Sequence, residues 1–128
     1  MRKLKLPGRD KTRPRLDQQD IKLIRKQGID QVKRNAERLV GQKFKESEAD
    51  PKIPTAGNPV YKAMHACNCT SRDQIFMSHR IRPEKELTEA QIESLTDLLI
   101  RWIVREHNFY REEEKEKQIK LGDFYTRN

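Results

Sequence analysis

Three polar side chains, His65, Arg72 and His79, recur at seven-residue intervals in the stretch of the sequence that has the most mixed chemistry. Because seven residues make nearly two turns of an α-helix, one continuous helix would carry all three on a single face. Two imidazoles and a guanidinium could supply a general base, a general acid and a clamp for a phosphate group. The trio is therefore the candidate catalytic site of a small nuclease or phosphotransfer enzyme.

A structural interpretation of the same trio is the more common outcome for such an isolated set. In it, each histidine bonds a backbone carbonyl or lies at a helix end, and Arg72 pairs with Asp73 or with an acid of a loop. The sequence contains no phosphate-binding glycine loop, nucleophile elbow, His-Glu-x-x-His helix or pair of catalytic carboxylates. It leaves open whether the protein is an enzyme.

The only two cysteines, Cys67 and Cys69, lie between the two histidines. Together with His65 and His79 they would complete the ligand set of a tetrahedral zinc site. Within one helix, however, a Cys-x-Cys pair points its sulfur atoms about 200° apart, so both could bind one ion only if the helix ended between them. The alternative is a small core residue at Cys67 and a half-exposed thiol at Cys69. We expect reduced thiols and no cofactor, with zinc as the less favoured hypothesis.

The chain is strongly basic, with 28 Lys and Arg against 20 Asp and Glu and a net charge of +8. Residues 1–50 hold 15 basic and 8 acidic side chains. This surplus favours a nucleic acid or another polyanion as partner, although charge identifies neither a sequence nor a groove, and a basic surface can serve solubility alone. The candidate nucleic-acid contacts are Arg9, Lys11, Arg13, Arg15, Lys22, Arg25, Lys26, Lys33, Arg34 and Arg38.

The apolar content suits one small domain with a lean core, because hydrophobic residues make up 34% of the chain against a usual share of about 45–50%. A second copy or another protein could complete that core through the aromatic residues near the C-terminus, which would make the chain a protein-interaction adaptor. The alternative is that Trp102 simply fills the core. No apolar stretch is long enough to span a membrane or to act as a leader, so we expect a cytoplasmic protein without a membrane partner.

Helix signals divide the chain into a flexible basic arm (1–15), a helical domain (16–121) and a tail (122–128). Asp17 as a cap and Gly28 as a stop delimit a first helix of about ten residues. Asp30 is the expected cap of a second helix that runs through Lys45, and residues 46–57 should form a loop. Asn58 then caps a third helix with a proline in its first position.

Two further helix starts are predicted in the second half of the chain. Ser71 and Gln74 form a plausible capping box for a short fourth helix ending near His79, which would bring His65 and His79 face to face across a tight corner. Thr88 and Gln91 form a clearer box at the start of a long amphipathic helix that Gly122 should end. No alternation typical of strands occurs, so we expect a single all-α domain of about five helices.

A set of residues in the same order and spacing carries a family resemblance. The set comprises Arg15-Leu16, Gly28, Pro54-Thr55, Gly57-Asn58-Pro59-Val60-Tyr61, Ala63, His65-Ala66, Arg72, His79, Ile81 and the helix from Leu98 to Ile103 with Trp102. From about Arg15 to Arg105 the chain resembles a family of small bacterial proteins catalogued only as a domain of unknown function, DUF4186. The resemblance implies a small helical domain with a polar centre at the trio, and no activity. Members carry cysteines after the His-Ala pair where this chain has Thr70, Ser71 and Gln74, so any metal site that those cysteines imply does not carry over to this chain.

Overall fold

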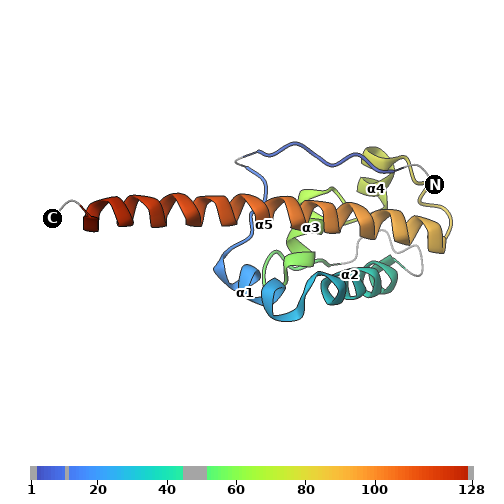
Figure 1. The fold of residues 1–128 in the computed structure, drawn as a ribbon. Coiled ribbons are helices and arrows are strands. Elements are labelled where there is room, and N and C mark those ends of the chain that lie inside the picture. The colour runs from blue at the N-terminus through green and yellow to red at the C-terminus, as the bar shows by residue number, and fades with distance from the viewer. Residues whose placement is uncertain (1–2, 11, 45–51, 127–128) are drawn as a thin grey trace.

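The structure, a computed structural model, describes the backbone of residues 3–10, 12–44 and 52–126 and the side chains among them as far as Lys117. This part of the chain contains helices and no strands (Figure 1). The five helices are α1 (Gln18–Gln27), α2 (Ile29–Phe44), α3 (Pro59–Ala66), α4 (Arg72–His79) and α5 (Glu89–Thr126). The predicted all-α fold of about five helices is confirmed.

Side-chain caps begin most of these helices where the sequence predicts them. Asp17 and Asp20 exchange hydrogen bonds with each other's backbone N–H groups at the start of α1. Asn58 accepts from the Val60 N–H at 2.9 Å, with Pro59 in the first helical position of α3. Thr88 and Gln91 form the predicted reciprocal box before α5. Each cap satisfies backbone donors that the first turn of a helix leaves without partners.

Three local predictions are wrong in detail. Gly28, at φ 83°, both ends α1 and accepts the first hydrogen bond of α2 from Val32, so Asp30 lies inside the first turn of α2 instead of capping it. Gln74 bonds the backbone and hydroxyl of Thr70, and Ser71 alone provides the cap of α4. Gly122, the predicted end of the last helix, lies within α5. A helix tolerates an internal glycine at a cost of about 1 kcal/mol, and it ends at a glycine only where the backbone adopts a left-handed conformation.

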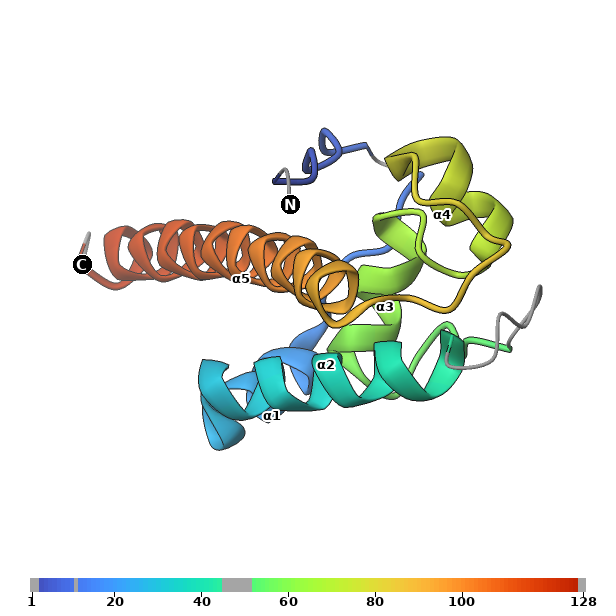
Figure 2. The same ribbon diagram turned by 90° about the vertical axis from the view of Figure 1, so that its right-hand side faces the viewer.

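The core lies where the N-terminal half of α5 crosses α2 and α3 (Figure 2). Leu95, Leu98 and Leu99 from α5 are buried together with Val32, Ala36, Leu39, Val40 and Phe44 from α2. Trp102 is only 2% exposed, which confirms that it fills the core. The C-terminal half of α5 extends beyond the other helices (Figure 1). No helix in the part of the chain that the structure describes is long and apolar enough to cross a membrane.

The first residues, predicted as a flexible basic arm, have no helix or strand in their described part and run beside α5 (Figure 1). Arg101 and Arg105 of α5 donate to the carbonyl oxygens of Leu4 and Pro7, each at 2.6 Å. The Leu4 side chain is buried in the core cluster. No pattern in the sequence identifies a partner for this segment, whereas in the structure it contacts α5 of the same chain.

Candidate functional site

The predicted polar trio is divided between two helices. His65 lies in α3, while Arg72 and His79 are the first and last residues of α4. The turn that separates the helices contains Asn68 at φ 58°, a left-handed conformation that asparagine tolerates better than most residues. The three side chains therefore do not share the face of one continuous helix.

Each member of the trio bonds a carbonyl oxygen of a different backbone segment. The Nε2 atom of His65 lies 2.9 Å from the Ile53 oxygen, and that of His79 lies 2.7 Å from the Cys67 oxygen. Arg72 donates from Nη2 to the Arg82 oxygen at 2.6 Å. No hydrogen bond joins one member to another in the described structure. These contacts match the structural interpretation for the histidines, and the catalytic role stays a prediction.

Arg72 differs from the two histidines because its guanidinium is almost completely buried. The residue is 1% exposed, and its Nε and Nη1 atoms have no hydrogen-bond partner among the described residues. Burial lowers the pKa of Arg72, and the nearby charge of Glu84 opposes this effect. Asp73, the acid next to Arg72 in the sequence, is exposed and forms no ion pair with a described residue. Arg72 is thus a buried cation with incomplete compensation.

Both cysteines are buried, which corrects the expectation of a half-exposed thiol at Cys69. The Cys69 sulfur lies 3.4 Å from the Cys67 oxygen and 3.7 Å from His79 Nε2. Burial raises the pKa of Cys67 to about 12, against the opposing effect of Arg105 and other arginines, and raises that of Cys69 well above its ordinary value. Thiols that keep their protons are poor metal ligands. Residues 3–10, 12–44 and 52–117 contain no group of three His, Cys, Asp or Glu placed to hold a metal ion.

The arginines of the N-terminal segment are largely engaged within the chain. Arg9 forms a two-pronged ion pair with the buried Glu106, with contacts of 2.9 and 3.1 Å, and lies 3.8 Å above the centre of the Phe109 ring. Arg13 donates to the Ala66 oxygen at 2.6 Å. The Arg15 side chain is exposed, and Lys11 lies outside the described residues. Of the four cations proposed from this segment, two therefore already have internal partners.

The cations of α1 and α2 are arranged differently from those of the N-terminal segment. Residues 18–44 contain seven basic and three acidic side chains, and one of the acids, Asp20, is buried against Lys62. Arg25 reaches the exposed Glu114 of α5 at 3.2 Å. The remaining predicted contacts of these two helices are exposed and form no ion pair with a described residue: Lys22, Lys26, Lys33, Arg34 and Arg38.

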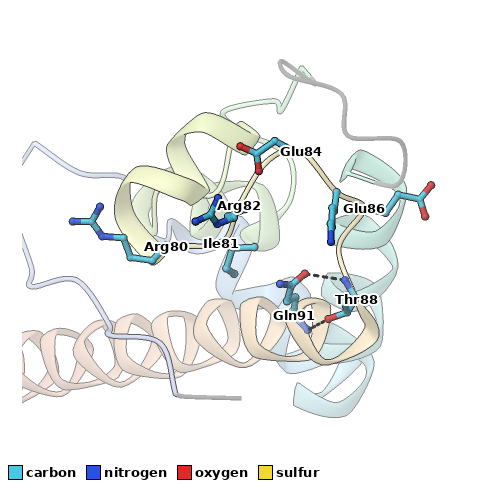
Figure 3. A pocket seen from close by; sticks show the side chains of 8 residues that line it. Arg80, Ile81, Arg82, Glu84, Glu86, Thr88 and Gln91 are labelled. Atoms are coloured by element: carbon cyan, nitrogen blue, oxygen red, sulfur yellow. Dashed lines mark hydrogen bonds between the residues drawn. The ribbon is translucent and has the colours of Figure 1, made fainter.

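A hollow lies between the loop that follows α4 and the first turn of α5. Its volume is about 840 Å³, and Figure 3 shows the side chains around it. It is lined by Arg80, Ile81, Arg82, Glu84, Lys85, Glu86, Thr88 and Gln91. The signal in the sequence is the group of three cations around Pro83, which a search for catalytic or metal-binding motifs passes over.

Comparison with known proteins gives a match to a sequence family. The sequence model described as "Domain of unknown function (DUF4186)" matches residues 6–104, which is most of the chain and includes the trio, both cysteines and the loop between α4 and α5. No curated protein and no solved structure matches the chain.

Proposed function

The chain belongs to the DUF4186 family, whose description names no activity, and we propose that it binds nucleic acid or another polyanion through the exposed cations of α1 and α2. One observation carries the proposal. Five basic side chains of these helices are exposed and have no carboxylate partner among the described residues, whereas Arg9, Lys62, Arg101 and Arg105 all have one. The exposed cations of α1 and α2 are therefore available for contacts with phosphate groups.

The spacing of these cations supports the same surface. Lys22 and Lys26 are four residues apart in α1, and Arg34 and Arg38 are four residues apart in α2. Like charges at this spacing lie on the same side of a helix and destabilise it by about 0.2–0.5 kcal/mol per pair. A phosphate backbone would turn this repulsion into attraction and would release the counterions condensed on the nucleic acid.

Salt dependence gives the proposal a quantitative form. Each phosphate of a duplex that a cation neutralises contributes about −0.9 to the slope of log K against log salt concentration. If Lys22 and Lys26 each contact one phosphate, replacing both with glutamine should reduce the slope by about 1.8. A nucleic-acid ligand and two reduced cysteines agree with a cytoplasmic location, which is part of the proposal.

The test is fluorescence anisotropy with a labelled duplex of random sequence, measured over a series of salt concentrations. We expect Lys22→Gln/Lys26→Gln to bind more weakly than the parent chain and with a smaller slope. The matched control is Lys115→Gln/Lys117→Gln, which removes the same charge from exposed positions of α5. Equal losses in both variants would mean that only net charge matters, and binding that does not depend on salt would also contradict the proposal.

Deleting the N-terminal segment is a less specific test of the same idea. The deletion would remove the buried Leu4 and would leave the buried Glu106 without Arg9. Since an uncompensated buried charge is strongly destabilising, a truncated chain would change its stability together with its binding. Point substitutions at exposed positions avoid this difficulty.

A further inference from the structure

The hollow between the α4–α5 loop and the first turn of α5 has the size of a ligand site. Its volume of about 840 Å³ falls within the range of about 300–1,000 Å³ that is typical of pockets for small molecules. Figure 3 shows the loop from Arg80 to Thr88 curving around it, with Gln91 of α5 on the opposite side. It is separate from the cations of α1 and α2, none of which lines it.

The charged side chains of this hollow are mainly basic. Arg80, Arg82 and Lys85 are exposed and form no ion pair with another described residue. Two carboxylates, Glu84 and Glu86, belong to the same lining. In Figure 3 the Glu86 side chain is turned away from the other labelled side chains, and Arg80 extends toward the opposite side. Of the lining cations, Arg82 and Lys85 lie within the loop, on either side of Pro83 and Glu84.

The first turn of α5 lines the same hollow through Thr88 and Gln91. Thr88 and Gln91 bond each other's backbone N–H groups, with distances of 2.9 and 3.1 Å. The capping box leaves the N–H groups of Glu89 and Ala90 without partners inside the helix. The amino end of a helix carries partial positive charge and favours anions, which the carboxylate of Glu89 offsets in part.

Arg72 is buried behind the loop that lines this hollow. Its guanidinium donates to the backbone oxygen of Arg82, one of the lining residues, while Nε and Nη1 remain without partners. Glu84 is the carboxylate whose charge acts on it, yet the two form no ion pair. A buried cation that lacks partners is costly, and native proteins that contain one commonly supply a bound ion or water. The charge around Arg72 thus calls for an anion nearby.

We propose that this hollow binds a small phosphorylated ligand, with the phosphate group held by Arg82 and Lys85 and further stabilised by the charge of Arg72 behind the loop. The lining contains three cations, Arg80, Arg82 and Lys85, against two carboxylates, Glu84 and Glu86. The buried Arg72 behind the loop adds a fourth positive charge, so the surplus around the hollow is two. That surplus matches a phosphate monoester, which carries close to two negative charges at neutral pH. A guanidinium also fits the oxygens of a phosphate group with two parallel hydrogen bonds.

Titration with inorganic phosphate in place of chloride, at constant ionic strength, tests this proposal by NMR. We expect saturable shifts of the backbone amide signals of residues 80–82 and 84–91 and of the Nε–Hε signal of Arg72. Arg82→Gln/Lys85→Gln should weaken the affinity for phosphate by roughly tenfold or more, because charge-assisted hydrogen bonds are lost. The backbone oxygen of residue 82 remains in this variant, so the anchor of Arg72 is kept.

The matched control is Lys22→Gln/Lys26→Gln, which removes the same charge from α1. Under the proposal it keeps its affinity for phosphate, and Arg82→Gln/Lys85→Gln keeps most of its affinity for duplex DNA. Unsaturable shifts with phosphate, or equal losses in the two variants, would overturn the proposal. If phosphate fails to saturate while Arg82→Gln/Lys85→Gln loses DNA binding, the hollow belongs to the polyanion surface, and the proposal is again refuted. Failure of DNA binding alone would refute only the function proposed for α1 and α2.

Discussion

Replacing Lys62 should strongly destabilise the fold, because its ammonium group joins α3 to the start of α1 in a buried site. Lys62 is 8% exposed and donates to Asp20 at 2.6 Å, to Asp17 at 3.1 Å and to the Arg15 oxygen at 3.2 Å. These three contacts use all three protons of the ammonium group. Lys62→Met keeps an unbranched side chain but removes the ammonium group, which leaves the carboxylate of Asp20, 4% exposed, without its cation.

The expected loss is about 3 kcal/mol in the free energy of unfolding, the lower end of the range for removing one partner of a buried ion pair. The lower end applies because Asp20 keeps one hydrogen bond, from the Asp17 N–H at 3.0 Å. Lys62→Met/Asp20→Asn removes the buried charge as well, while the asparagine oxygen can still accept that bond. We expect the double variant to recover about 2 kcal/mol of the loss.

Urea denaturation followed by far-UV circular dichroism and by the fluorescence of the buried Trp102 measures both changes. Urea is preferred to guanidinium because it does not screen charges. Lys115→Met is the control, since Lys115 and its partner Glu112 are both exposed and 3.8 Å apart, and an exposed pair contributes at most about 1 kcal/mol. A Lys62→Met chain as stable as the control, or a double variant no more stable than Lys62→Met, would refute the argument.

Three further predictions concern pH, the thiols and the N-terminal segment. Burial lowers the pKa of Lys62, but the hydrogen bonds to Asp20 and Asp17 outweigh this effect and raise the pKa above its ordinary value. The contribution of Lys62 to stability is therefore full below the unfolded pKa of about 10.4 and is lost as the pH rises through the folded pKa. Urea midpoints above about pH 10 should fall more for the parent chain than for Lys62→Met. Cys67 and Cys69 should resist iodoacetamide at neutral pH in the native chain and react once it unfolds, as mass spectrometry would show, because burial disfavours both thiolates; rapid alkylation of the native chain would contradict this. Glu106→Ala should speed tryptic cleavage after Arg9, because Glu106 holds Arg9 through two-pronged contacts; an unchanged cleavage rate would mean that the other contacts of the segment suffice.

The helix boundaries were predictable where a short side chain and a backbone donor lie within a few residues of each other. Asp17, Asn58, Ser71 and Thr88 each cap the helix that the sequence assigns to them. Such caps depend on local geometry alone, so the sequence contains all the information they need. Gly122 shows the limit of this reasoning, because a glycine permits a helix to end without requiring it.

The position of the N-terminal segment and the role of the trio were not predictable from local patterns. Arg9 and Glu106 are 97 residues apart, and nothing near Glu106 marks it as a buried acid. The seven-residue spacing of His65, Arg72 and His79 places them on one face only if the helix continues, and the turn at Asn68 interrupts it. Each of these three side chains bonds a backbone carbonyl oxygen outside a regular helix pattern. A sequence does not indicate which carbonyl oxygens need such a side-chain partner.

Net charge alone does not locate the proposed anion-binding surface, because the structure divides the cations into two groups. Arg9, Lys62, Arg101 and Arg105 lie against carboxylates or carbonyl oxygens of the same chain and stabilise the fold. Lys22, Lys26 and the cations of the α4–α5 loop have no such partner among the described residues and are exposed. Substitutions in the first group should therefore change stability before they change binding, whereas those in the second should change binding at unchanged stability. Measuring both quantities for each variant separates a surface that binds anions from one that only keeps the helices together.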